Sequence, residues 1–143
     1  MKMEIENQKL VATHDFMYKL ELVRKKSRAR RELCDIIKER TTKNADTRKK
    51  ILEEHSHKDE EGNAIIEDDN YQIKDIKLAQ EDLNEFNKET LVIEGGEHRE
   101  LLRTLRTIFE GLEEKEFGAE ESEIYDYLYD QLDKNEEEKG AEE

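Results

Sequence analysis

The chain has 143 residues, of which 45% are charged and 34% hydrophobic, and its net charge is −14. So few apolar residues disfavour a large compact core, and this length fits one domain better than two. No run of about 18 apolar residues occurs and the N-terminus lacks a signal-peptide core, so we expect neither a membrane span nor secretion. The chain has no proline, which permits long uninterrupted helices.

The N-terminal segment predicts a short strand followed by a helix. MEIEN at 3–7 alternates apolar and polar residues, which is typical of a strand. Asn7 is a residue that caps helices well, so we expect it to begin a helix over about 8–18. The residues at helical spacing that we expect to face inward are Leu10, Val11, His14, Met17 and Tyr18.

Residues 24–55 predict the longest helix. Leu33, Ile36 and Ile37 form one apolar stripe, which Ile51 and Leu52 resume after a polar interval. A pattern of this length indicates either one long helix with a solvated stretch or a helical hairpin broken near residues 41–42. Cys34 lies within the stripe, so we predict a buried, unreactive thiol, and a single cysteine points to a reducing, intracellular compartment.

The middle of the chain predicts a hairpin and a second helix. Gly62 and Asn63 indicate a turn, and two short apolar runs flank the acidic turn at 68–70. The amphipathic helix that follows starts near Asp75, and its apolar residues are Ile76, Ala79, Leu83 and Phe86.

The last part of the chain predicts a strand, two helices and a tail. Residues 90–93 form the strongest strand pattern, and its partner is either residues 3–7 or the hairpin within 57–73. We expect a helix over 101–112 at the centre of the core. A final helix over 119–132 should turn Ile124, Tyr127, Leu128 and Leu132 inward, with Tyr125 and Tyr129 on a different face.

The predicted fold is therefore mostly α with a small β element. It has about five helices and two to four short strands in a single domain over 1–132. Residues 133–143 are acidic and predict a disordered tail.

Charge is segregated along this sequence. Residues 24–50 hold twelve Lys/Arg and four acids, whereas residues 110–143 hold fifteen acids and three lysines. Such asymmetry is typical of interaction surfaces and charged tails. The candidate partner-binding cations are Arg24, Lys25, Lys26, Arg28, Arg30 and Arg31. They could pair with acids elsewhere in the fold or on a protein partner; nucleic acid is disfavoured because the segment has no aromatic residues and the whole chain is acidic.

The acidic final third has two interpretations. Carboxylates spaced along a helix can imitate the phosphates of a duplex and so inhibit a nuclease, or they can be a solvated face. The candidate residues that we single out are Glu120, Glu121 and Asp126.

No pattern in the sequence indicates catalysis, a cofactor or a metal. GxSxG, HExxH and CxxC motifs do not occur. Residues 59–69 resemble a calcium loop in part, and aligning Gly62 with the loop glycine puts four residues at ligand places: His57, Asp59, Glu61 and Asp68. Histidine at the first place and aspartate at the twelfth break that pattern, so we predict an ordinary turn and a non-enzymatic protein.

Several short phrases carry a resemblance to a known family. They are MEIENQKLV at 3–11, SRAR at 27–30, EE-x(4)-DEEGNAIIEDDNYQIKD at 53–75, VIEGG at 92–96 and EIYDYLYDQL at 123–132. In this order they resemble domain-of-unknown-function family 1617, a family of small proteins from tailed phages and prophages of Gram-positive bacteria. The resemblance spans residues 3–132 and implies a setting, the cytoplasm of the host bacterium or the virion, but no site residue.

These observations together predict a non-enzymatic phage accessory protein that binds another protein, in virion assembly or host takeover. The alternatives are inhibition of a host defence nuclease or effector by charge mimicry, and nucleic-acid binding through residues 24–50. We expect self-association, of an order that the sequence leaves open.

Overall fold

The computed structural model describes the backbone of residues 1–142 and the side chains of residues 1–132. Its α-helices are α1 (Leu10–Tyr18), α2 (Arg24–Glu54), α3 (Ile76–Lys88), α4 (Arg99–Glu110) and α5 (Ala119–Glu142). Its strands are β1 (Lys2–Glu6), β2 (Ile66–Glu67), β3 (Asn70–Tyr71) and β4 (Thr90–Glu94), with 3-10 turns η1 (Asn7–Lys9) and η2 (Gly96–His98). The predicted class, mostly α with a small β element, is confirmed. The predicted disorder of 133–143 falls outside the described side chains and stays a prediction.

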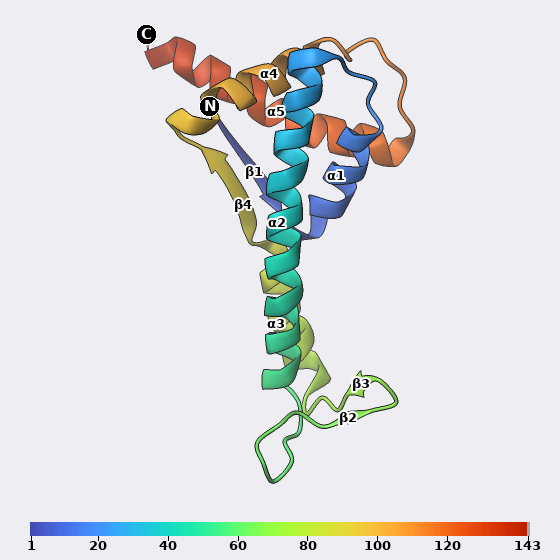
Figure 1. The fold of residues 1–143 in the computed structure, drawn as a ribbon. Coiled ribbons are helices and arrows are strands. Elements are labelled where there is room, and N and C mark those ends of the chain that lie inside the picture. The colour runs from blue at the N-terminus through green and yellow to red at the C-terminus, as the bar shows by residue number, and fades with distance from the viewer. Residues whose placement is uncertain (143) are drawn as a thin grey trace.

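Figure 1 shows two regions that share the long helix α2. In the head, which we define as residues 1–40 and 89–132, β1, β4, α1, α4 and α5 surround the upper part of α2. In the stalk, residues 41–88, the lower part of α2 lies beside α3, and the β2–β3 hairpin forms the tip. The molecule is therefore elongated along α2.

Helix α2 is continuous over 31 residues, so the alternative of a broken helical hairpin is wrong. The Thr41 and Thr42 hydroxyls donate to the Lys38 carbonyl, at 2.9 and 3.0 Å, within the same helix. Their polar side chains are thereby satisfied without a break in the helix. At a rise of 1.5 Å per residue, α2 spans roughly 45 Å.

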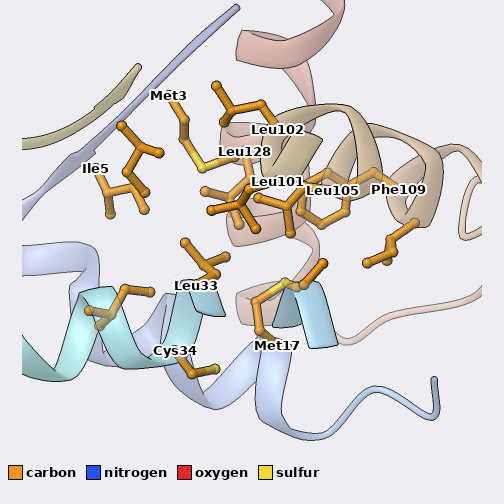
Figure 2. Close-up of a cluster of buried hydrophobic side chains, with 14 of the residues drawn as sticks. Met3, Ile5, Met17, Leu33, Cys34, Leu101, Leu102, Leu105, Phe109 and Leu128 are labelled. Atoms are coloured by element: carbon orange, nitrogen blue, oxygen red, sulfur yellow. The ribbon is translucent and has the colours of Figure 1, made fainter. Parts of the chain in front are cut away.

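The core of the head is built around α4, as predicted. Figure 2 shows side chains of β1, α1, α2, α4 and α5 coming together in one cluster. Its fully buried members include Met3, Ile5, Leu10, Met17, Leu33, Ile37, Ile93, Leu102, Leu105, Phe109, Leu128 and Leu132. Each α4 residue that contributes lies on one helical stripe, and burial of that stripe drives the packing.

Strand β1 pairs antiparallel with β4, which settles the open choice of its partner. The other edge of β1 is closed by side chains rather than by a strand. Gln131 of α5 accepts from the Glu4 N–H at 2.7 Å and donates to the Glu4 carbonyl at 2.9 Å. The Tyr127 hydroxyl donates to the same carbonyl at 3.1 Å. These side chains occupy backbone groups of β1 that would otherwise be open to another strand.

Asn7 does not cap a helix, contrary to the prediction. Its side chain is buried, donates to the Phe86 carbonyl at 2.8 Å, and accepts from the Asn44 amide at 2.9 Å. Burying an amide requires partners, and these two come from α2 and α3. Asn7 therefore joins the head to the stalk.

The predicted hairpin and second helix are confirmed in the stalk. β2 and β3 pair through a tight turn in which Asp68 and Asp69 both have positive φ, 52° and 64°. Two consecutive residues with φ > 0 are typical of the turns that connect hairpin strands, and aspartate tolerates this conformation. Asp75 caps α3 by accepting from the Leu78 N–H at 3.2 Å.

Two predicted helix faces need correction. On α1, Val11 and Tyr18 are exposed, while Thr13 and Phe16 are buried with Leu10 and Met17. On α5, Leu128 and Leu132 are buried as predicted. Tyr125 and Tyr129 also reach the core, because their rings pack against Phe109 at centroid distances of 5.9 and 6.2 Å.

Candidate functional site

The predicted cations lie on the first two turns of α2, at the top of the head in Figure 1. We call the five exposed ones the basic end: Arg24, Lys25, Lys26, Arg28 and Arg31. Only Lys25 forms an ion pair within residues 1–132, with Glu100 at 3.3 Å. The other four cations of the basic end make no ion pair with these described residues, so their charge is open to a partner.

Arg30 differs from its neighbours. It is half-buried, and its guanidinium donates to the Leu20 carbonyl in the segment that joins α1 to α2. Arg40 and Arg48, also half-buried, act in the same way lower on α2, donating to the Thr90 carbonyl and the Asn87 side chain at 3.4 Å each. These three arginines hold α2 to its neighbours through carbonyl and amide oxygens. Among the six predicted cations, the expected pairing with an acid of the fold is seen within residues 1–132 for Lys25 with Glu100.

A groove between α2 and α4 adjoins the basic end. It consists of two neighbouring hollows of about 330 and 300 Å³. Their lining comprises Lys25, Lys26, Arg28, Ala29, Glu32, Glu100, Leu101, Arg103, Thr104 and Thr107. Arg103 brings a further cation from α4, which sequence reasoning missed because it lies far along the chain from α2.

Glu100 partly neutralises this groove. Its carboxylate lies 3.3 Å from both the Lys25 ammonium and the Arg103 guanidinium. The hydrogen bond from Lys25 lowers the pKa of Glu100, so the carboxylate stays ionised. The groove therefore has mixed charge, because Glu32 and Glu100 line it together with Lys25, Lys26, Arg28 and Arg103.

A smaller hollow of about 150 Å³ lies between α1 and α2. It is lined by Tyr18, Ser27, Arg30, Arg31, Cys34, Asp35 and Lys38. Tyr18 gives the basic surface the aromatic neighbour that residues 24–31 lack in sequence. The residue is 69% exposed, and its ring stacks on that of His14 with the ring centroids 5.8 Å apart.

Cys34 has the environment that was predicted. The residue is buried, and desolvation raises the pKa of its thiol despite nearby Arg30 and Lys38. A thiol held protonated is a poor nucleophile, since thiolate is the reactive form.

The three candidate acids do not form one surface. Glu120 and Glu121 border a hollow of about 200 Å³ against α1, together with Asp15 and Lys19. Asp126 is exposed and lies roughly 120–140° around α5 from them, at 100° per residue. These three acids therefore do not present one continuous face that could imitate the phosphates of a duplex.

The calcium-like segment adopts the predicted turn. The Asp59 side chain accepts the N–H groups of Glu61 and Asn63 at 2.9 Å each, which is an Asx-type turn. Within the described residues, no group of three or more His, Cys, Asp or Glu is placed to hold a metal ion. The expected absence of catalysis stays a prediction.

No family model, no curated protein and no solved structure matches this chain. The resemblance to the phage family therefore stays a prediction. In the described part, no helix is both long and apolar enough to cross a membrane.

Proposed function

We propose that this protein is a non-enzymatic accessory protein of a tailed phage, and that it acts by binding another protein. The basic end of α2 contacts an acidic surface of that partner. One observation carries the proposal: Arg24, Lys26, Arg28 and Arg31 are exposed and make no ion pair within residues 1–132. The setting, a host bacterial cytoplasm or the virion, rests on the family resemblance alone.

A protein partner suits this surface better than nucleic acid. The basic end is small, and the chain as a whole carries a net charge of −14. Charges are screened beyond about 8–10 Å at physiological salt, so a compact acidic patch can use the basic end alone. A long polyanion would also meet the acidic surfaces of the head. Charge mimicry has less support, because Glu121 and Asp126 face different directions.

The test is affinity purification of the tagged protein from infected Gram-positive cells, with identification of what is recovered. We expect one phage structural protein or one host protein at a stoichiometric level. The variant Arg24→Glu/Arg28→Glu/Arg31→Glu should lose that protein. It leaves Arg30 intact, since reversing Arg30 would disturb the contact with Leu20.

The matched control is Lys43→Glu/Lys49→Glu/Lys50→Glu, which changes the charge equally on exposed positions of the same helix. The control should retain the partner. Equal loss in both variants would show a general charge effect, and retention in both would remove the basic end from consideration. Recovery of nucleic acid without protein would favour the nucleic-acid alternative.

A further inference from the structure

Beside the basic end lies a surface that combines exposed apolar groups, a hollow and cations. We define it as the α1–α2 face: Val11, His14 and Tyr18 on α1 with Arg31 and Lys38 on α2. We infer that this face binds an acidic segment of the partner protein, with one apolar side chain of that segment entering the hollow beside Tyr18. The inference rests on the proposed function and names the partner's chemistry.

The apolar part of the face is the outward side of α1. Val11 and Tyr18 are 64% and 69% exposed. They are seven residues apart, which places them on the same side of the helix about two turns from each other. Single exposed apolar residues are common. Here two lie on one side of α1, and one of them, Tyr18, lines the hollow.

The hollow fits one side chain rather than a metabolite. Its volume of about 150 Å³ is below the roughly 300–1,000 Å³ of ligand pockets. The buried residue Cys34 contributes to its lining, and Tyr18 supplies an aromatic wall. An apolar side chain placed there would bury surface of both residues.

Two cations of the α1–α2 face indicate that the bound partner segment is acidic. Arg31 and Lys38 are exposed, line the hollow and make no ion pair with the described residues. They are seven positions apart on α2, which corresponds to a rise of about 10 Å along the helix. Carboxylates on either side of the inserted side chain could reach both cations. Such anchoring by an apolar group with flanking charge is usual at interfaces.

Asp35 argues against a nucleic acid on this face. It also lines the hollow, between Arg31 and Lys38 along α2. A continuous phosphate backbone that contacted both cations would pass over this carboxylate, whereas a peptide can present an apolar or hydrogen-bonding group there. Val11, about two turns from Tyr18 on the same side of α1, likewise has no side-chain group that could bind a phosphate.

The first experiment places the photo-crosslinking amino acid p-benzoylphenylalanine at position 18 in infected cells, with position 76 as the control. Ile76 is 76% exposed but lies on the stalk. We expect a crosslink from position 18 to a partner segment in which acidic residues flank an apolar one. A crosslink to nucleic acid, to a segment without acids, or from position 76 alone would overturn the inference.

The second experiment titrates the crosslinked segment, as a synthetic peptide, against the purified protein. Tyr18→Ala and Lys38→Glu should each weaken binding at least about 5-fold, as contact residues do. Lys43→Glu, the same change further down α2, should leave the affinity within about 2-fold. Unchanged affinity in both Tyr18→Ala and Lys38→Glu would overturn the inference.

The two proposals fail separately. Because Arg31 belongs to both surfaces, the double reversal Arg24→Glu/Arg28→Glu separates them. If this double reversal abolishes partner recovery and the Tyr18→Ala and Lys38→Glu variants do not, the proposed function holds and the α1–α2 face is excluded. If all of these variants recover the partner equally, both proposals fall.

Discussion

The head and the stalk are held together by different means. The head buries a contiguous apolar cluster drawn from β1, α1, α2, β4, α4 and α5. Within residues 41–88, the buried side chains are only Asn44, Ile51, Ser56, Ala79 and Phe86, and none of them belongs to that cluster. The buried apolar residues of this chain are thus concentrated in the head, and the stalk has little core of its own.

Directional polar contacts replace packing in the stalk. His55 contacts Asp82 at 2.9 Å, which links the end of α2 to α3. The Arg48 guanidinium lies 5.3 Å from the centre of the Phe86 ring and also reaches Asn87. Because such contacts contribute about 1 kcal/mol each, we expect the stalk to open locally while the head stays folded.

The largest effect is expected from a core substitution in the head. Phe109→Ala removes a fully buried ring that contacts Tyr125 and Tyr129. We expect the free energy of unfolding, measured by urea denaturation, to fall by about 3–5 kcal/mol. Ile76→Ala on the exposed stalk surface is the control and should change it by less than about 0.5 kcal/mol. A loss below 1 kcal/mol for Phe109→Ala would mean that the head is not the packed region.

The junction should give the next largest effect. Asn44→Ala leaves the buried Asn7 side-chain oxygen without its donor, and we expect a cost of about 1–3 kcal/mol in the same assay. The control is Asn84→Ala, whose exposed side chain bonds only Gln80 and should be near neutral. Equal effects of the two variants would show that the buried network does not couple the regions.

Alkaline pH should weaken the head through α5. Burial raises the pKa of Tyr125 and Tyr127, and the hydrogen bond to Glu113 raises that of Tyr129. In the unfolded chain tyrosine ionises near pH 10, so above about pH 10 the unfolded state has lost protons that the folded state keeps. Stability is thus complete below pH 10 and falls as the pH rises further. Unfolding titrations between pH 9 and 12 should show this fall.

Tyrosine-to-phenylalanine variants sharpen that measurement. Tyr127→Phe and Tyr129→Phe should each reduce the slope of stability against pH above pH 10, because each removes one ionising group. A free energy of unfolding that is flat over this range in the natural protein would contradict the assignment.

The smallest effect on the head is expected from the tip. The His57 N–H donates to the Gln72 carbonyl at 2.8 Å, so the two ends of the hairpin are adjacent. Replacing residues 58–71 by a two-residue Asn-Gly turn should change the unfolding of the head by less than about 1 kcal/mol, since shortening a surface loop alters closure entropy only slightly. A shift above 2 kcal/mol would show that the stalk and head unfold as one unit.

Sequence periodicity predicted the buried residues correctly where a segment had one strong apolar pattern that fitted one helix or strand face. The stripe of α4 and the alternation in β1 predicted which of their side chains are buried, the apolar run at 90–93 predicted β4, and the cap residue Asp75 predicted the start of α3. On α1, residues 10, 13, 16 and 17 fit a helical face as well as the predicted set. Phe16 faces the core because its ring packs against those of Phe117 and Tyr125, with centroids 5.3 and 6.4 Å apart. These two residues come about one hundred residues later in the chain.

Polar residues were harder to place than apolar ones. Nothing local distinguishes Arg30, which donates to Leu20, from the exposed Arg28 and Arg31. Asn7 is a residue type that often caps helices, but its hydrogen-bond partners are Asn44 and Phe86, which lie 37 and 79 residues away in the chain. The basic segment could therefore be found from charge alone, while the division between its exposed and its half-buried cations depends on tertiary contacts that a single sequence does not show.

The two edges of β1 have a consequence for folding on the ribosome. One edge pairs with β4, and the other is closed by Gln131, 127 residues from Glu4. Synthesis proceeds at about 5–20 residues per second, so many seconds pass between the synthesis of β1 and that of Gln131. The stalk, whose contacts are more local, is complete earlier. Closure of the head is thus a late event, and contacts of such long range fold slowly.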